Sequence, residues 1–406
     1  MKKSTGKILI LVLLLTACAS FAVLDVTGGV AARQAAPQYV FDPTWPKALP
    51  NNWKMGGVTG LAVDKDDNVW VLNRPNDTTE QEDNASTNPP TAHCCVRPPT
   101  MIHISGRTGE VIGSFDAPQG HGMDVDSQGF VYIGQDTVRK YDPKSGKMVK
   151  EVARAPETQP QGGGRGRGNV DPAEQAKAVA AFRAKYPPTT PLIVGIIEEI
   201  RLDEKAREMY VADSYLGGRV MVYDLDTFAF KRGWGAYGKP LAQISINDAD
   251  REYKPNGPMP KEFRGHLTLN FANDGLVYAA DRNANRIHVT DKQGKFIKEF
   301  IMAAETGEGG STGGVAFSSD PQQRFLIISD LTNNHIWFLN RADGKVVGQM
   351  GSMGDNGGQW YGLHMIAIDS QGNIYTGEVQ NGERVQRFVP ATSPRGKLLT
   401  QLAAMR

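Results

Sequence analysis

Cysteine, net charge and long hydrophobic runs are all scarce in this chain of 406 residues. Three cysteines, Cys18, Cys94 and Cys95, cannot build a disulfide scaffold. Lysine and arginine number 45 and aspartate and glutamate 44, and this net charge of +1 removes the general electrostatic case for nucleic-acid binding. A composition of 40% hydrophobic and 22% charged residues nevertheless suits a folded globular protein and excludes a disordered chain.

The N-terminus has the pattern of an export signal over residues 1–18. Three lysines within the first seven residues precede an apolar run, Ile8 to Leu15, that is too short for a membrane span. Leu15-Thr16-Ala17-Cys18 resembles a bacterial lipobox, in which the cysteine becomes lipidated. Cleavage within Ala17-Cys18-Ala19 and an uncleaved anchor reaching Val26 remain as alternatives. All three predict a folded part outside the cytoplasm, in the periplasm, at the cell surface or at the outer membrane. In the lipoprotein interpretation, membrane attachment is expected only through a lipid on Cys18.

Internal repeats predict the fold. Glycine (45 residues) and proline (24 residues) are frequent without a collagen period, which favours many tight turns between short strands. Six segments share an apolar strand, an Asp/Gly turn and a second apolar strand; they are 60–72, 122–133, 199–211, 267–279, 315–328 and 365–376. Further strands follow most copies, and four strands per repeat are typical of a β-propeller blade. We therefore expect an all-β, six-bladed β-propeller over residues 39–392.

The ends of the predicted propeller and its insertions complete the domain organisation. A linker (19–38) precedes the propeller and a tail (393–406) follows it. The last repeat weakens before its outer strand, and we expect Tyr39–Phe41 from the N-terminus to supply that strand and protect the open edge. Three insertions are expected to decorate one face and shape access to the centre; they are 75–99, 154–192 and 238–262.

Two insertions carry further local signals. Asp171 and Pro172 predict the start of one short helix, which ends before Pro187. The Gly/Arg-rich run 162–168 reads as a flexible solvated loop. Cys94 and Cys95 are predicted to form a vicinal disulfide, and zinc binding together with His93 is the weaker alternative.

Three of the seven histidines occupy the same position in their repeats. His121, His266 and His364 each stand at the start of a blade's first strand, in blades 2, 4 and 6. First strands line the central channel of a propeller, so these imidazoles should converge about 120° apart around its axis. Zinc favours histidine ligands, and a catalytic zinc keeps one position open. We therefore expect a metal site at these three residues. Channel-lining polar side chains are the alternative, and we interpret His103, His288 and His335 as structural.

Other residues should emerge near the same mouth. The matching positions of the odd blades hold Thr59, Glu198 and Gly313, of which Glu198 is a candidate substrate contact or extra ligand. Arg74 and Arg282 end second strands, and Tyr215 follows one closely. Two guanidinium groups beside a metal suit a carboxylate-bearing substrate. The alternative is that each arginine pairs with a neighbouring aspartate, as Arg282 could with Asp281.

With these residues the chain, over roughly residues 45–390, resembles an NHL-repeat propeller and more narrowly the peptidyl-α-hydroxyglycine α-amidating lyase (peptidylamidoglycolate lyase) family. The family's motifs have counterparts in Val71-Leu72-Asn73-Arg74, His121-Gly122, Val211-Ala212-Asp213-Ser214-Tyr215, His266, Ala280-Asp281-Arg282 and His364. The resemblance implies zinc on the three histidines, with the tyrosine and the two arginines around a small anionic or peptide-like substrate. The family's aspartate for a structural calcium is replaced by Met365, and its disulfides have no counterparts, which argues against calcium.

The resemblance implies a catalytic role for Tyr215, Arg74 and Arg282. Zinc would lower the pKa of the hydroxyl of a carbinolamide-type substrate, Tyr215 would remove or relay its proton, and the arginines would hold its carboxylate. Cleavage of the C–N bond would release an amide and glyoxylate. A non-catalytic NHL propeller that binds a protein partner at the cell envelope is the first alternative. Another six-bladed enzyme, a calcium lactonase or a quinone-dependent sugar dehydrogenase, is the second, although a lactonase needs carboxylates where this chain has histidines.

Overall fold

The computed structural model describes residues 35–87, 89, 91–157, 160 and 171–405. The predicted signal peptide, the lipobox with Cys18 and the Gly/Arg-rich run 162–168 lie outside the described residues. Within the described part, no helix combines the length and apolar character needed to span a bilayer.

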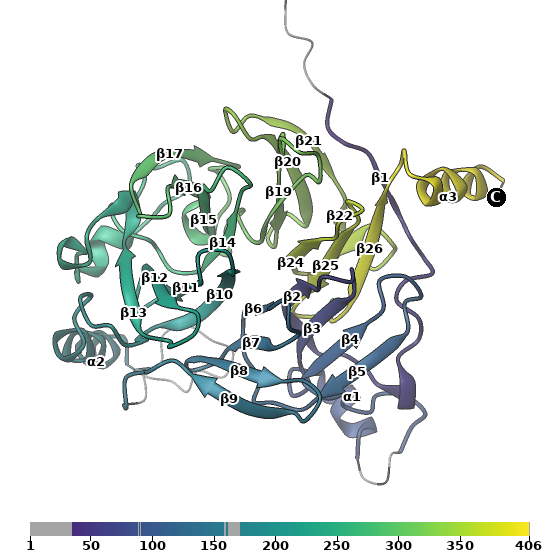
Figure 1. Cartoon of the computed structure of the whole chain (residues 1–406), viewed down its shortest axis with the longest axis horizontal. Helices are drawn as coiled ribbons and strands as arrows, with labels where there is room; N and C mark the ends of the chain where they lie inside the picture. Colours follow the sequence, from purple (N-terminus) through teal and green to yellow (C-terminus); the bar gives the residue numbers. More distant parts are fainter. Residues whose placement is uncertain (1–34, 88, 90, 158–159, 161–170, 406) are drawn as a thin grey trace, which may run out of the picture. The chain divides into compact units, whose positions relative to one another are not determined.

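Six antiparallel sheets of four strands are arranged around a common centre (Figure 1) and confirm the predicted six-bladed propeller. The first three blades consist of β2 (Gly57–Val63), β3 (Val69–Arg74), β4 (Met101–Ile104) and β5 (Val111–Phe115); β6 (Met123–Val125), β7 (Val131–Gly134), β8 (Val138–Asp142) and β9 (Lys147–Glu151); and β10 (Ile196–Asp203), β11 (Glu208–Ser214), β12 (Arg219–Asp224) and β13 (Phe230–Trp234). The next two consist of β14 (Leu267–Phe271), β15 (Val277–Asp281), β16 (Arg286–Thr290) and β17 (Phe296–Ile301); and β18 (Val315–Phe317), β19 (Phe325–Asp330), β20 (His335–Asn340) and β21 (Val346–Met350).

Blade 6 is shared between the two ends of the chain. Its inner strands are β24 (Leu363–Ile368), β25 (Ile374–Glu378) and β26 (Val385–Pro390), and its outermost strand is β1 (Tyr39–Phe41), as the sequence predicts. Val40 pairs with Val389 in this sheet. The innermost strands contact one another in the cyclic order β2, β6, β10, β14, β18, β24 and back to β2, so the ring is closed. Closure protects the sheet edge that a linear array would expose.

The first turn of several blades depends on one repeated aspartate. In Asp64, Asp126 and Asp369, one carboxylate oxygen accepts hydrogen bonds from the backbone N–H groups two and four residues further on. Such a side chain replaces backbone partners in a tight turn, and it explains why an Asp/Gly turn recurs between the first and second strands.

The hydrophobic core is divided among the contacts between blades. Six clusters of buried apolar side chains each join two neighbouring blades, and together they run round the whole ring. Strands at the middle of a blade are therefore covered on both faces, and every residue of β11 and β15 is buried. This two-sided burial explains why those segments read as continuous apolar runs in the sequence.

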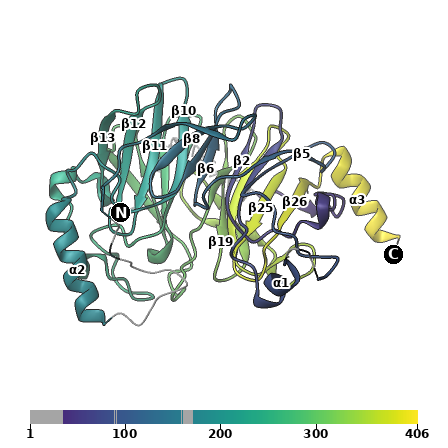
Figure 2. The same ribbon diagram turned by 90° about the horizontal axis from the view of Figure 1, so that it is seen from below.

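Two of the three α-helices among the described residues lie in the insertions. The predicted helix is α2 (Pro172–Lys185), with the Asp171 carboxylate accepting from Ala173 N at 2.7 Å. Two further helices are α1 (Glu80–Ala85), in the first insertion, and α3 (Pro394–Ala404), where only a tail was predicted. Figures 1 and 2 show α2 and α3 on the outer side of the ring. A short parallel pair, β22 (Ser352–Met353) and β23 (Gln359–Trp360), precedes blade 6.

Buried arginines attach the insertions to the blades. Arg219 pairs with Asp213 at 2.8 Å, both fully buried, and donates to the Leu192 carbonyl at 2.7 Å. Arg286 pairs with Asp281 at 2.9 Å, both fully buried, and donates to the Glu262 carbonyl at 2.7 Å. In each case the ion pair lies at the hinge between the second and third strands, and it anchors the segment that enters the same blade.

Candidate metal centre

The three register histidines meet at the centre of the ring. His121 lies two residues before β6, and His266 lies directly before β14. His364 lies within β24. They belong to blades 2, 4 and 6, and a fourth side chain, Glu198 of β10 in blade 3, joins them. One ligating atom from each of the four residues lies within 4.8 Å of the other three. The predicted convergence of the imidazoles is therefore present in the structure.

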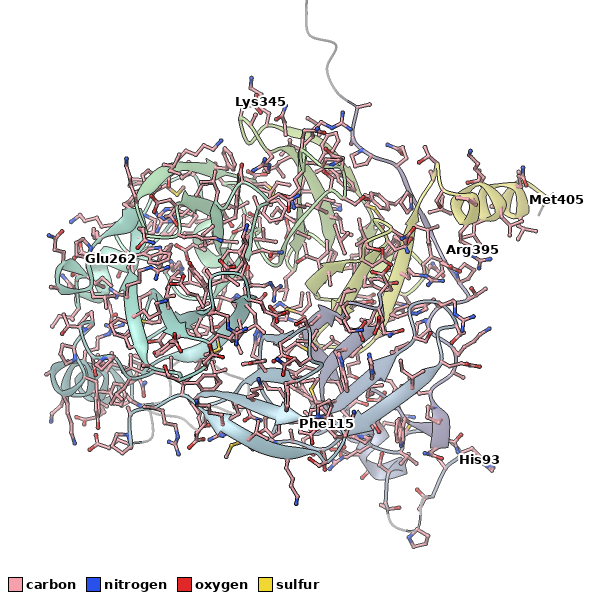
Figure 3. All side chains as sticks on the ribbon, viewed as in Figure 1. His93, Phe115, Glu262, Lys345, Arg395 and Met405 are labelled. Atoms are coloured by element: carbon pink, nitrogen blue, oxygen red, sulfur yellow. A yellow bond between two sulfur atoms is a disulfide. The ribbon has the colours of Figure 1, made fainter. Side chains whose placement is uncertain are left out.

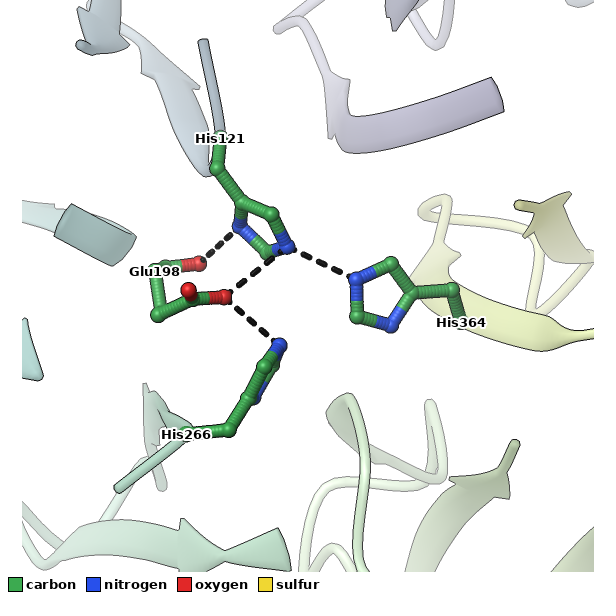
Figure 4. A group of neighbouring side chains, drawn as sticks. All are labelled: His121, Glu198, His266 and His364. Atoms are coloured by element: carbon green, nitrogen blue, oxygen red, sulfur yellow. Dashed lines mark hydrogen bonds and ion pairs between the residues drawn. The ribbon is translucent and has the colours of Figure 1, made fainter. Parts of the chain in front are cut away.

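Distances within this group are short (Figure 4). His121 Nε2 lies 2.7 Å from His364 Nε2 and 2.9 Å from Glu198 Oε2. The same carboxylate oxygen lies 2.6 Å from His266 Nε2. All four residues are buried, with exposed fractions between 2% and 6%. We call these four residues the histidine cluster.

The donor atoms of the histidine cluster fit a divalent metal ion. Glu198 Oε2 and His266 Nε2 are buried and satisfy no hydrogen-bond geometry, although they are only 2.6 Å apart. Buried polar atoms normally have a partner, and a bound ion is one explanation for buried donor and acceptor atoms that have none. Imidazole nitrogens and a carboxylate oxygen are ligands that divalent transition metals prefer. The group could hold such an ion.

Protonation also suits metal binding. Burial, together with the charge of Arg282, lowers the pKa of His266 to about 4. Burial and the neighbouring imidazoles hold the pKa of His364 well below its usual value. Burial opposes ionisation of Glu198, but His121 and His266 outweigh it and keep its pKa well below the usual range. The cluster therefore offers imidazole lone pairs and a carboxylate at neutral pH.

β-Bulges direct two of the four side chains toward the centre of the ring. The pairing of β10 with β11 skips Glu198, and the pairing of β24 with β25 skips His364, so each is the extra residue of a β-bulge. The same bulge occurs at Thr59 in blade 1. A bulge turns the extra side chain out of the strand alternation, and it is a common device beside functional sites. The repeat position identified from the sequence thus coincides with a repeated bulge.

Neighbouring blades hold the histidines in place. His121 Nδ1 lies 2.9 Å from the Glu198 backbone carbonyl, so donation from Nδ1 leaves the Nε2 lone pair free for a metal. Gly122, at φ +69°, permits this approach, because a Cβ there would lie 2.7 Å from that carbonyl oxygen. Thr59 Oγ1 donates to the Gly120 carbonyl at 2.8 Å, and Ser329 Oγ donates to the His364 carbonyl at 2.8 Å.

The predicted substrate residues line the same cavity as the histidine cluster. This cavity, the histidine cavity, has a volume of about 810 Å³. Its walls include Arg74, Tyr215, Arg282 and the four cluster residues. Arg74 ends β3, Arg282 follows β15, and Tyr215 follows β11 with a left-handed backbone at φ +51°. The structure thus brings together all six residues predicted for the site.

The two arginines of the histidine cavity form no ion pair with a carboxylate among the described residues. Within the described residues, neither Arg74 nor Arg282 forms an ion pair, and Arg282 Nε is buried without a hydrogen-bond partner. Asp281, the sequence neighbour of Arg282, pairs with Arg286 instead. Two unpaired guanidinium groups make the cavity suitable for an anion.

Tyr215 is poised as a neutral phenol. Burial and the Glu198 carboxylate raise the pKa of Tyr215, while Arg282 and Arg74 only partly offset that effect. Its ring centroid lies 6.4 Å from that of His266, and its backbone N–H donates to the Gly265 carbonyl at 3.3 Å. The residue just before His266 therefore also positions Tyr215.

The remaining histidines have partners outside the cluster. His103 lies in β4, 2.9 Å from the Asp64 carboxylate, and His288 lies in β16, 3.3 Å from the Glu299 carboxylate. His335 begins β20 and contacts the Gly351 carbonyl. Cys94 and Cys95 form the predicted vicinal disulfide. Figure 3 shows His93 at the edge of the molecule, away from the centre of the ring.

Some residues of the site carry no clear signal in the sequence. The sequence identified Thr59 only as an occupant of the register position and Glu198 as a candidate substrate contact or extra ligand. It missed Ser329, which supports His364. It also missed Asn334, whose side-chain oxygen accepts from Gly362 N at 2.9 Å at the cavity wall. These contacts join different blades, so a repeat alignment of single blades contains no trace of them.

Comparisons with known proteins do not assign this chain to a family. No protein-family model matches the chain, and no curated protein sequence matches it. A structural-genomics protein of unknown function from Bacteroides thetaiotaomicron is similar over 88% of this chain and 73% of that chain, with 14% identity and a TM-score of 0.49. A catalytically inactive virginiamycin B lyase from Staphylococcus aureus, solved with quinupristin, is similar over 89% and 90%, with 11% identity and a TM-score of 0.44. Such distant similarities leave the function to be argued from the site itself.

Proposed function

We propose that the protein is a divalent-metal-dependent lyase that acts on a small anionic substrate in the histidine cavity. One observation carries the proposal: four buried ligating atoms converge within 4.8 Å beside two guanidinium groups that have no carboxylate partner among the described residues. The first feature suits a metal and the second suits an anion, and both open into one cavity of about 810 Å³.

His121, His266 and His364 would hold the ion, and the donor set together with the family resemblance favours zinc. A bound divalent ion supplies Lewis acidity, which lowers the pKa of a substrate hydroxyl. The chain's contribution is to present the imidazoles without their protons. Burial does this by lowering the pKa values of His266 and His364.

Arg74 and Arg282 would bind the substrate carboxylate. A guanidinium group offers paired donors that match the two oxygens of a carboxylate, and such charge-assisted hydrogen bonds are strong. Both arginines lie in the wall that faces the histidine cluster. They would therefore orient the substrate so that the carbon next to its carboxylate points toward the histidine cluster. The hydroxyl group on that carbon would then face the cluster as well.

Tyr215 would move the proton. For a carbinolamide substrate, the hydroxyl loses its proton, its oxygen forms a C=O double bond, the C–N bond breaks, and the nitrogen gains a proton. Products are an amide and glyoxylate. Because its pKa is raised, Tyr215 holds its proton at neutral pH, so it would donate that proton to the departing nitrogen and recover one from the substrate hydroxyl. The raised pKa of Tyr215 thus favours a proton relay over simple proton removal by a tyrosinate.

The test combines elemental analysis with an assay of glyoxylate release from an α-hydroxyglycine peptide. We expect one equivalent of a divalent metal and turnover in the wild type, with both lost in His266→Ala. His335→Ala, which removes a histidine outside the cavity, should keep both. Metal binding without turnover would reject the lyase and leave a metal site on a binding propeller. Absence of metal from protein purified without chelators would reject the metal site as well.

Export remains a proposal that rests on the basic and apolar N-terminal sequence. We propose that the protein acts outside the cytoplasm, bound to a membrane through Cys18 if the lipobox is used. Fractionation of cells producing the wild type and Cys18→Ser would test it. Recovery of the wild type in the cytoplasm would contradict export, whereas equal release of both forms would contradict lipidation.

A further inference from the structure

Two adjacent glutamates in β10 are used in different ways. Glu199 follows the strand alternation and pairs with Arg201 at 2.8 Å. Glu198 is the bulged residue, and its carboxylate turns to the axis of the ring, where it meets His121 and His266. The bulge therefore adds a carboxylate to the three imidazoles, in a register position that Thr59 and Gly313 fill without charge in the other odd blades.

The Glu198 carboxylate is deeply buried and forms no ion pair with a lysine or arginine among the described residues. Its exposed fraction is 3%, and its Oε2 atom satisfies no hydrogen-bond geometry. Within the described residues, the imidazoles of His266 and His121 are the groups that pair with this carboxylate, at 2.6 and 2.9 Å, and no arginine or lysine forms an ion pair with it. An ionised carboxylate in such a place needs a compensating charge, because burial of an unpaired charge is costly. A divalent ion bound by the same imidazoles supplies that charge.

We propose that Glu198 is a fourth protein ligand, so that the centre has three histidines and one carboxylate. This inference rests on the proposed function and deepens it. Four protein donors would fill a tetrahedral ion, as in closed structural zinc sites. A substrate can then bind only to an ion that accepts five or six ligands. The open side of the cluster faces the histidine cavity, and Arg74 and Arg282 line the wall of that cavity.

This coordination narrows the substrate class. A five- or six-coordinate ion beside two guanidinium groups suits a substrate that carries a carboxylate and an adjacent hydroxyl or carbonyl oxygen. One oxygen would reach the ion while the carboxylate meets the arginines. Simple carboxylates without the second oxygen would bind only through Arg74 and Arg282, and should bind more weakly.

Cobalt(II) loading tests the ligand set without relying on turnover. Four-coordinate cobalt(II) absorbs visible light strongly, whereas five- and six-coordinate cobalt(II) absorbs weakly. We expect a weak spectrum for the wild type at one equivalent of cobalt. Glu198→Ala should give a more intense, four-coordinate spectrum and bind cobalt more than about tenfold less tightly. Glu199→Gln is the matched control, because it alters the adjacent buried carboxylate, and it should change neither property.

Each outcome decides a separate point. Coincident spectra and affinities for the wild type and Glu198→Ala would overturn the ligand assignment and leave the three-histidine metal site intact. An intense spectrum from the wild type would overturn the five- or six-coordinate state. A wild type that binds no cobalt would overturn both the inference and the proposed metal site. Glu198→Gln, which preserves the shape of the side chain, provides the same comparison if the alanine variant does not fold.

Discussion

Arginines at the blade hinges and arginines in the histidine cavity have opposite surroundings. Arg219 and Arg286 are fully buried against Asp213 and Asp281. Arg74 and Arg282 have no ion pair among the described residues, although Arg282 follows Asp281 directly in the sequence. A hinge arginine has its charge matched within the fold and serves structure, whereas a cavity arginine keeps its charge available for a ligand. The partner of the guanidinium group, rather than its burial, separates the two roles.

The largest effect is expected from removing the carboxylate of a buried Arg–Asp ion pair between the second and third strands of a blade. Asp213→Ala leaves Arg219 buried without its carboxylate, and we expect the free energy of unfolding to fall by about 3–5 kcal/mol. Denaturant-induced unfolding followed by circular dichroism measures it. Arg282→Met is the control, because it removes a charge that has no partner, and it should change stability by less than about 1 kcal/mol. Equal losses in the two variants would remove the distinction.

The next effect concerns metal affinity. His364→Ala removes one imidazole of the histidine cluster, and we expect the metal dissociation constant to rise more than about 100-fold, beyond the range usual for residues that only support a ligand. Competition with a chelating indicator measures this constant. His103→Ala, which alters a histidine paired with Asp64 outside the cavity, should leave it unchanged. An unchanged constant in His364→Ala would mean that the cluster is not the metal site.

A smaller effect is expected on the affinity of the metal-loaded protein for an anion. Arg282→Met should weaken binding of glyoxylate to the metal-loaded protein by about 10- to 100-fold, the equivalent of losing a hydrogen bond to a charged group. Isothermal titration calorimetry gives the constant. Arg207→Met removes an exposed arginine that pairs with Asp226, and it should not alter binding. If both variants bind glyoxylate like the wild type, Arg282 is not an anion-binding residue.

The smallest effect is expected for the ion pair of Glu208 with Arg232, whose side chains are 10% and 20% exposed. Hydrogen bonds from Arg232 lower the pKa of Glu208 from 4.5 to about 2, although burial opposes the shift. The folded state therefore binds its proton less readily than the unfolded chain, so the stabilisation is present above pH 4.5 and disappears as the pH falls toward 2. Unfolding free energies of Glu208→Gln should fall less steeply over this interval than those of the wild type. Parallel pH profiles would show that the pair adds nothing.

Repetition explains how much of this molecule the sequence predicts. Equivalent positions in a ring of blades lie at equal radius and depth, so the register of His121, His266 and His364 was enough to predict their convergence. The same reasoning predicted Arg74, Tyr215 and Arg282 at one mouth. In both cases the inference needed only the order of strands within a blade, which alternating apolar segments reveal.

Contacts between blades and local backbone irregularities were beyond that reasoning. The bulge that turns Glu198 toward the axis depends on how β10 pairs with β11. The choice of Arg286 over Arg282 as the partner of Asp281 depends on the hinge between β15 and β16. Neither leaves a periodic pattern. The helix α3 is different, because its start does have a local signal. Ser393 and Pro394 form a helix-capping pattern within the segment predicted as a tail.

The shared sixth blade has a consequence for how the chain must be made. Tyr39 pairs with Pro390, so the first and last strands of the ring are separated by nearly the whole sequence. Such distant contacts form slowly, and they cannot form until the ribosome has released the last blade. During synthesis β1 stays without its partner strand until β26, near the end of the chain, has been made. The edge of β1 that pairs with β26 is exposed for that time. Chaperones that shield this edge would matter more for this protein than for one whose blades each close on their own.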